Sequence, residues 1–282
     1  MDLRRFADVD DFLAVAGDFL GAREAEHNLI LGICSQLRDQ PDAFGDRPPY
    51  LAAVTSGERL VAAALRTPPF NLILSEIDDP DAIDRLVEDR RGDDLPGVLG
   101  PVEHARAFAE RWSALEGGTS RLRVSERIFR LGTVIAPPTV AGHLRIATPG
   151  DGDLVRTWLQ GFMEDAFGEA DADEVAAAAA RWQEGRGRTL YLWVDGGPVS
   201  LCGVGGRTPS GIRIGPVYTP PHARRRGYAS ALVATSSQLQ LDAGRRFCFL
   251  FTDLANPTAN HIYQAIGYEG VRDVDEYRFE GR

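Results

Sequence analysis

Short apolar runs separated by polar, glycine-containing turns predict two hairpins that resemble each other. The first covers residues 50–54 and 60–65 around a turn at 56–58, and the second covers 190–194 and 199–205 around a turn at 195–197. Apolar runs of this length between turn signals are typical of buried strands. Four residues recur at one constant offset, as the pairs Tyr50 and Tyr191, Arg66 and Arg207, Thr67 and Thr208, and Pro68 and Pro209. We interpret these matches as an internal repeat, and chance similarity between two hairpins is the alternative interpretation.

The repeat predicts two domains of similar architecture. Helical patterns precede both hairpins, over about residues 7–37 and 151–185, and a Pro-rich join lies near residues 136–142. A length of 282 residues suits two domains of about 140 residues each. We expect residues 1–138 and 139–282 to form two α/β (α+β) domains, each with a mixed, mostly antiparallel sheet flanked by helices.

The segment from Val217 to Ser230 carries the clearest chemical signal. It is predicted to leave a strand at Val217, Tyr218 and Thr219, to pass through three arginines, and to enter a helix after Gly227. Backbone N–H groups in the first turn of a helix lack helical acceptors and lie at the positive end of its dipole. Together with the arginines they predict a site for a pyrophosphate. An exposed basic turn without a ligand is the alternative interpretation.

The sequence downstream adds a second motif. An apolar strand at residues 247–252 precedes a helix that begins near Asn256, contains Tyr263 and closes at Gly267, and a last strand covers 274–279. The order strand, Arg-x-x-Gly-x-Ala, helix, strand, and Asn with Tyr seven residues later resembles the acyl-CoA-binding half of the GNAT superfamily of N-acetyltransferases. The resemblance extends over about residues 212–268.

The resemblance implies acetyl-CoA as cosubstrate and a tandem arrangement of two GNAT-like domains. Arg224, Gly227 and Ala229 match the family's pyrophosphate loop, and the cofactor-binding residues that it implies are Val217, Tyr218, Thr219, Arg224, Arg225, Arg226, Gly227, Tyr228, Ala229, Ser230 and Asn256. Tyr263 matches a tyrosine often proposed to protonate the leaving thiolate. Many members have glycine at the position of Arg225, so this chain departs from the pattern there.

Transfer to an amine also needs a group that removes a proton, because an alkylamine with a pKa near 10.4 is mostly charged at neutral pH. The strand at residues 212–219 contains no carboxylate. Glu164, next to Asp165 near the end of a predicted helix, is the candidate base, and Glu276 on the final strand is another. A solvated acid on a helix surface is the alternative for each of them.

The first half is expected to be a degenerate copy without a cofactor loop. Residues 77–81 include three aspartates where the second half has Arg224–Gly227. These acids would repel a pyrophosphate and suit a helix start instead. The first half is therefore predicted to support the fold, enclose substrate or form an oligomer contact. A homodimer is one such possibility.

Composition narrows the partners. The net charge of −10 argues against nonspecific binding to nucleic acid or a membrane surface. All 31 basic residues are arginine, a bias from which we draw no functional conclusion. Cys34, Cys202 and Cys248 lie far apart, so neither a metal site nor a disulfide framework is predicted. No run of about 18 apolar residues and no secretory pattern occurs, and a cytoplasmic location is expected.

We therefore predict an N-acetyltransferase that moves the acetyl group of acetyl-CoA to a primary amine by direct attack. The acceptor is a small molecule or a peptide, with no metal, nucleic acid or membrane involved. The alternative is a noncatalytic acyl-CoA-binding module with a regulatory or sensor role.

Overall fold

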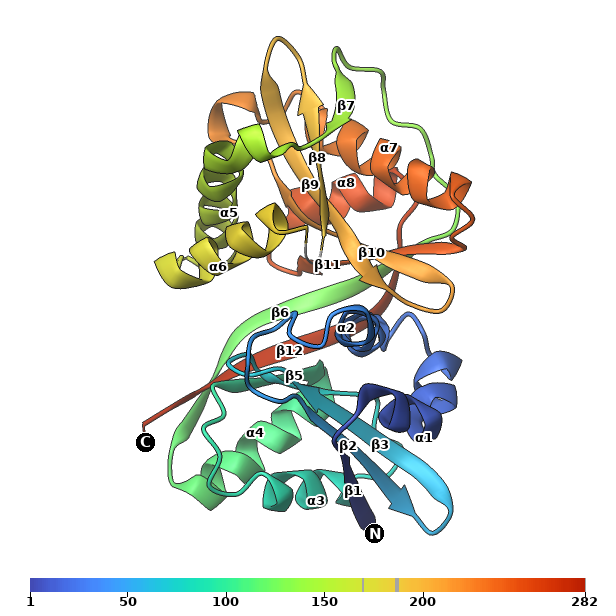
Figure 1. Ribbon diagram of the computed structural model, residues 1–282, viewed down its shortest axis with the longest axis vertical. Helices are drawn as coiled ribbons and strands as arrows, with labels where there is room; N and C mark the ends of the chain where they lie inside the picture. The colour runs from blue at the N-terminus through green and yellow to red at the C-terminus, as the bar shows by residue number, and fades with distance from the viewer. Residues whose placement is uncertain (169, 186–187, 282) are drawn as a thin grey trace. The chain divides into compact units, whose positions relative to one another are not determined.

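The computed structural model describes residues 1–168, 170–185 and 188–281. The chain forms two compact units (Figure 1). We call Met1–Ile128 with Val271–Arg282 the N-terminal unit, and Phe129–Gly270 the C-terminal unit.

The N-terminal unit contains four helices and parts of two long strands that also enter the C-terminal unit. Its elements are β1 (Asp2–Phe6), α1 (Val9–Ala22), α2 (Asn28–Asp39), β2 (Tyr50–Ser56), β3 (Arg59–Arg66), β4 (Leu72–Leu74), α3 (Asp81–Asp89), β5 (Gly97–Pro101), α4 (Val102–Glu116), most of β6 (Thr119–Leu131) and most of β12 (Glu269–Glu280). The two helices before the first predicted hairpin, and the hairpin itself, are confirmed.

The C-terminal unit repeats this order. Its elements are β7 (His143–Ile146), α5 (Gly152–Phe167), α6 (Ala172–Gln183), β8 (Thr189–Val194), β9 (Pro198–Arg207), β10 (Gly211–Tyr218), α7 (Tyr228–Asp242), β11 (Phe247–Asp253) and α8 (Pro257–Ala265). The second predicted hairpin and the helices predicted around it are confirmed.

Strand pairing follows one scheme in both units. In the N-terminal unit β1, β2, β3 and β4 pair antiparallel in sequence order, and β4 pairs parallel with β5. In the C-terminal unit β7, β8, β9 and β10 pair antiparallel, and β10 pairs parallel with β11. A parallel pair requires a crossover connection, which α3 and α7 provide. The mixed, mostly antiparallel sheets predicted from the sequence are confirmed.

Helices cover both faces of the sheet in the C-terminal unit (Figure 1). Leu190 and Leu192 of β8 pack with residues of α5 and α6, whereas Tyr191 and Trp193 pack with residues of α7. This alternation follows from the two-residue period of a strand. It explains why β8 is apolar or aromatic from Leu190 to Val194: both of its faces are covered.

The compact units depart from the predicted division at residues 138 and 139. β12 comes last in the chain, yet it pairs antiparallel with β5 of the N-terminal unit, with Val274 opposite Pro101 and Arg278 opposite Gly97 (Figure 1). The C-terminal unit in turn begins at Phe129, within β6. The final strand was predicted, but its partner could not be, because strand pairing is a nonlocal contact.

Ion pairs between β6 and β12 strengthen this arrangement in the N-terminal unit. Arg127 donates to Asp273 at 2.6 Å, and Arg123 donates to Glu276 at 2.8 Å. Glu276, considered above as a base, is thus held by an arginine of the N-terminal unit.

Among the described residues, no helix is long and apolar enough to cross a membrane. Cys34, Cys202 and Cys248 are buried, free thiols.

Candidate functional site

Strands β10 and β11 separate part-way along their length. Their parallel register covers only Gly211–Arg213 and Phe247–Phe249, although β10 continues to Tyr218 and β11 to Asp253. Beyond a bulge, β10 stays paired with β9, with Val217 opposite Cys202. The outer half of β10 is therefore held from the β9 side, and its edge toward β11 is the place where an extended ligand can add main-chain hydrogen bonds.

The loop after β10 ends in a glycine whose conformation is required. Gly227 has φ +81°, and a Cβ atom added there would lie 2.8 Å from Cγ1 of Val140. Two residues earlier, Arg225 has φ +61° and is the one non-glycine residue with positive φ in the described part of the chain. The backbone thus keeps a glycine-like turn at Arg225 although a side chain there costs roughly 1–2 kcal/mol.

Helix α7 begins without a side-chain cap. Gly227 is its N-cap residue, and its carbonyl accepts the N–H of Ala231 at 3.0 Å. The N–H groups of Tyr228, Ala229 and Ser230 precede the first helical hydrogen bond. These three predicted residues therefore offer backbone donors at the positive end of the helix dipole.

The three arginines of the loop are exposed, and the first is already engaged. Arg224 donates through Nε to the Thr219 carbonyl at 2.9 Å and through Nη2 to Oδ2 of Asp165 at 2.5 Å. The pair links the loop to α5. Arg225 and Arg226 have no carboxylate partner among the described residues, so they are the side chains best suited to a further anion.

The side chains of the remaining predicted residues of β10 and α7 contact other residues of the unit. Their backbone groups are therefore their main contribution to binding a ligand. The Thr219 hydroxyl lies 2.8 Å from that of buried Ser200, and the Tyr218 ring packs against Trp158 with centroids 6.2 Å apart. Tyr228 is buried, and its hydroxyl donates to Asp195 at 2.5 Å. Its side chain is part of the core, which the sequence motif did not reveal.

Tyr263 lies on α8 and is half-buried against the core of the C-terminal unit. Its ring meets that of Tyr268 edge to face, with centroids 6.0 Å apart. Burial raises the pKa of Tyr263, and the Cys202 thiol lies close enough to add to this shift. The phenol therefore keeps its proton at neutral pH, as a proton donor must.

Asn256 caps helix α8, and this structural role can be measured separately from cofactor binding. It is the N-cap of α8, where Oδ1 accepts the N–H of Ala259 at 3.0 Å, and Pro257 follows at the first helical position. Such a cap contributes about 1 kcal/mol. The Nδ2 group is the part of the side chain that remains as a donor for the cofactor contact implied by the resemblance.

We expect Asn256→Ala to lower the free energy of unfolding by about 1 kcal/mol through loss of the cap. Asn256→Ser keeps a capping oxygen but removes the amide donor, so it should restore stability while acetyl-CoA binding stays weaker than in the wild type. Chemical denaturation and calorimetric titration of the two variants measure the two quantities. Full affinity in the serine variant would limit Asn256 to capping.

Glu164 is exposed on α5, where its carboxylate accepts from Gln160 at 2.9 Å. Its role as a base stays a prediction. The neighbouring Asp165 is the α5 acid that reaches the loop. Sequence reasoning missed this pair, since charge complementarity alone does not select one partner among many acids.

The N-terminal unit differs at the equivalent place. The parallel register of β4 and β5 ends at Ile73 and Leu99. Soon after it, the N–H of Glu76 donates to Nε2 of His27 at 2.9 Å, and the N–H of Ile77 donates to Nε2 of His104 at 3.2 Å. Two backbone donors near the opening are thus satisfied inside the unit, and acids follow instead of arginines.

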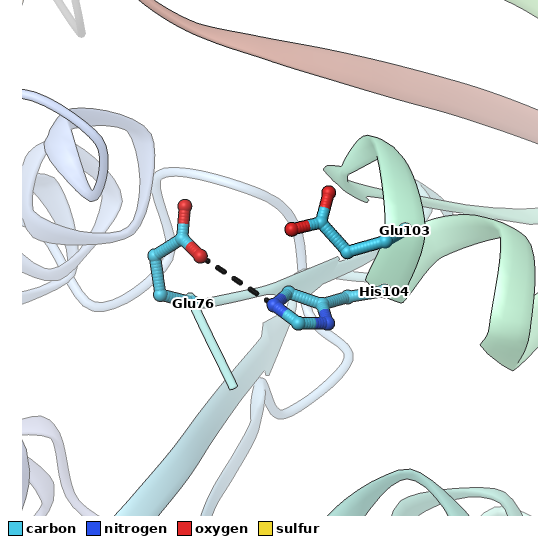
Figure 2. Close-up of side chains that lie close together, drawn as sticks. All are labelled: Glu76, Glu103 and His104. Carbon is cyan, nitrogen blue, oxygen red and sulfur yellow. Dashed lines mark ion pairs between the residues drawn. The ribbon is translucent and has the colours of Figure 1, made fainter. Parts of the chain in front are cut away.

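Three side chains of metal-ligand type also converge here. Figure 2 shows the carboxylates of Glu76 and Glu103 and the imidazole of His104 facing a common space. Arg272 donates to Glu76 through Nε at 2.6 Å and also donates to Glu103. Burial alone raises the pKa of Glu76, but its interactions with His104 and Arg272 lower it to about 2. The Arg272 guanidinium already provides a positive charge next to these carboxylates, so we interpret the cluster as an ion-pair network.

His27 predicts an acid-sensitive step in stability. It is 2% exposed, Nδ1 donates to the Leu20 carbonyl, and burial lowers its pKa from 6.5 to about 4. The unfolded chain therefore binds a proton more readily than the folded chain, and stability falls as the pH drops from 6.5 toward 4 by about 3 kcal/mol. Urea midpoints across this range test it, with His27→Gln as a non-titrating acceptor that should flatten the profile.

Comparison with known proteins agrees with this architecture. Residues 191–278 match the family model described as FR47-like protein. A Drosophila protein solved in a structural genomics programme superposes with a TM-score of 0.70 at 16% identity, covering 99% of this chain and 98% of that one. A tandem GNAT protein from the clavulanic acid biosynthesis pathway superposes with a TM-score of 0.57 at 15% identity, covering 99% and 98%.

The chain has the tandem GNAT fold. A GNAT-family acetyltransferase from Colwellia psychrerythraea, with a TM-score of 0.56 at 10% identity, covers 99% of this chain and 100% of its own. No curated protein gives a significant sequence match. The match to residues 191–278 includes the separated strands, the arginine loop and Tyr263. The predicted fold is therefore confirmed, at identities that speak for the fold alone.

Proposed function

We propose that the C-terminal unit is an N-acyltransferase that uses acetyl-CoA and transfers the acetyl group to a primary amine by direct attack. The observation that supports this most strongly is the uncapped start of α7, reached through an arginine loop at the separated end of β10. These features lie in one unit and follow one another in sequence from Val217 to Ser230.

The donor set fits a pyrophosphate. The N–H groups of Tyr228, Ala229 and Ser230 are available, Gly227 has no side chain to block approach, and Arg225 and Arg226 add charge. Hydrogen bonds of this charge-assisted kind contribute roughly 1.5–3 kcal/mol each. The basic loop stands out on a chain with a net charge of −10. When bound, acetyl-CoA supplies an acyl group activated as a thioester.

The residues of the unit have distinct roles in this proposal. The edge of β10 around Val217 and Thr219 pairs with the extended arm of the cosubstrate and directs an N–H at the thioester carbonyl. A donor at such a position contributes about 10²–10³ in rate. Tyr263 holds a proton at its phenol oxygen for the leaving sulfur. Its half-buried position and raised pKa are suited to that role.

The base is the least constrained part of the proposal. Glu164 remains our candidate, although its exposure and its bond to Gln160 also suit a surface acid. An exposed carboxylate can act through a water molecule. Glu164→Gln should then lower turnover most below the pKa of the amine, while an unchanged pH profile would remove Glu164 from the mechanism.

We assign no cofactor site to the N-terminal unit. Its equivalent opening has His27 and His104 on the backbone donors, and α3 begins with Asp81 and Asp84 in its first turn. We propose a supporting role for it, in enclosing substrate or in contact with a second copy of the chain. One acetyl-CoA per chain is the expected stoichiometry.

Titration calorimetry with acetyl-CoA, followed by an assay for free thiol with a panel of primary amines, tests the proposal. Saturable binding at one site per chain with amine-dependent thiol release supports the enzyme. Binding without release across the panel would favour the noncatalytic acyl-CoA-binding module. Absence of binding would overturn both.

A further inference from the structure

Arg188 is a partly buried cation that has no counter-ion among the described residues. It directly precedes β8, its side chain is half-buried, and its Nη1 atom is inaccessible to solvent with no hydrogen-bond partner. Burial lowers the pKa of Arg188 to about 10, so the guanidinium is still charged at neutral pH. A buried charged donor that lacks a partner is strongly unfavourable, and native proteins rarely keep one without a reason.

Three other arginines of the same unit differ in this respect. Arg145 donates to Asp151 at 2.7 Å, Arg224 to Asp165 at 2.5 Å and Arg156 to Asp153 at 2.8 Å. These pairs are more exposed, where a missing partner would cost less because water replaces it. The unpaired guanidinium thus lies where a partner matters most.

The strand register places Arg188 at the level where β10 and β11 separate. The next residue, Thr189, pairs with Val204 of β9, and Val204 pairs with Ile214 of β10. Ile214 directly follows Arg213, the last residue of β10 in register with β11. Arg188 is therefore level with the base of this opening, and β9 and β10 lie between the two in the sheet.

Cys202 connects Arg188 with the proposed proton donor. The Cys202 thiol lies close enough to the Arg188 guanidinium and to the Tyr263 phenol to contribute to the pKa of each. Cys202 is itself opposite Val217, on the strand proposed to hold the thioester. Arg188, Tyr263 and the outer half of β10 thus share one neighbourhood.

We infer that Arg188 binds a carboxylate carried by the substrate, close to the reacting amine. This inference rests on the proposed function of the unit. A guanidinium presents a planar fork of donors that matches both oxygens of a carboxylate, and a neutral ligand would leave the charge uncompensated. The carboxylate belongs either to the acceptor, which is then an amino acid, or to the acyl group of a dicarboxylic thioester.

Matched pairs of ligands test the inference and separate the two sources. For the acceptor, the twenty common amino acids are compared with their primary amides, using acetyl-CoA. For the acyl group, succinyl-CoA is compared with acetyl-CoA at a fixed amine. In a turnover-independent assay, thermal stabilisation by N-acetyl amino acids is compared with that by their primary amides. The variants are Arg188→Gln, Arg188→Lys and the exposed control Arg156→Gln.

In either the acceptor comparison or the acyl-group comparison, we expect the wild type to prefer the carboxylated ligand at least tenfold in kcat/KM. Arg188→Gln should lose that preference, Arg188→Lys should retain part of it, and Arg156→Gln should keep all of it. The affinity of Arg188→Gln for acetyl-CoA should stay within about twofold of the wild type, which also confirms that the variant is folded.

Equal use of acids and amides by the wild type in both arms would overturn the inference, even if every Arg188 variant failed to fold. An undiminished preference in Arg188→Gln would also overturn it. The thermal assay separates this failure from that of the proposed function. Carboxylate-dependent stabilisation without acetyl-CoA binding would support the Arg188 site and reject the acetyltransferase.

Discussion

Replacing Arg225 and Arg226 together by glutamate should raise the Kd for acetyl-CoA at least a hundredfold. Both side chains are exposed on the loop before α7, and neither has a carboxylate partner among the described residues. Each charge-assisted hydrogen bond contributes roughly 1.5–3 kcal/mol, and about 1.4 kcal/mol corresponds to a factor of ten. Reversal also adds repulsion. Titration calorimetry measures the change.

A shortened cosubstrate makes this experiment specific. S-acetylpantetheine lacks the pyrophosphate, so the wild type and the double variant should bind it with similar, weak affinity. Arg156→Glu, a charge reversal on α5 of the same unit, should leave acetyl-CoA binding nearly unchanged. An equal loss for acetyl-CoA and acetylpantetheine would contradict the assignment of these arginines to the pyrophosphate.

Tyr263→Phe should lower kcat at saturating substrates by about 10²-fold with little change in the Kd for acetyl-CoA. The phenol is half-buried, and burial raises its pKa, so the hydroxyl is protonated at neutral pH. General-acid contributions are typically 10²–10⁴-fold, and the low end applies because a thiol with a pKa near 8.5 leaves fairly easily. Steady-state kinetics and calorimetry separate the two effects.

Tyr268→Phe is the matched control for this variant. Its ring contacts that of Tyr263, and its hydroxyl lies 2.9 Å from that of Ser237 in the core. Loss of this hydrogen bond should lower stability by about 1 kcal/mol and leave kcat unaffected. With an acetyl thioester of a more acidic thiol, the deficit of Tyr263→Phe should shrink. Full turnover by Tyr263→Phe would exclude the phenol from the mechanism.

The sequence predicted features that depend on local pattern. The helix from Tyr228, the strand from Phe247 and both hairpins form where apolar runs and glycine turns indicate them. The cap at Asn256 was also readable in principle, because Asn followed by Pro is a typical helix start. The repeat predicted a shared topology, and the strand pairing of the two units confirms it.

Contacts between distant residues could not be predicted in the same way. Nothing local indicates that Arg224 pairs with Asp165, that the Tyr228 hydroxyl reaches Asp195, or that Nη1 of Arg188 has no hydrogen-bond partner in the described part of the chain. These depend on which surfaces the folded chain brings together. The glycine-like φ of Arg225 is similar, because the fold imposes a backbone conformation that the residue itself disfavours.

The pairing of β12 with β5 has a consequence for biosynthesis. The C-terminal unit is one continuous stretch, whereas the N-terminal unit needs residues from both before and after it. During synthesis from the N-terminus, residues 129–270 leave the ribosome in full before the strand that completes the N-terminal sheet. The N-terminal unit is therefore completed last, although most of it is synthesised first. Deleting residues 271–281 would remove the strand that completes its sheet.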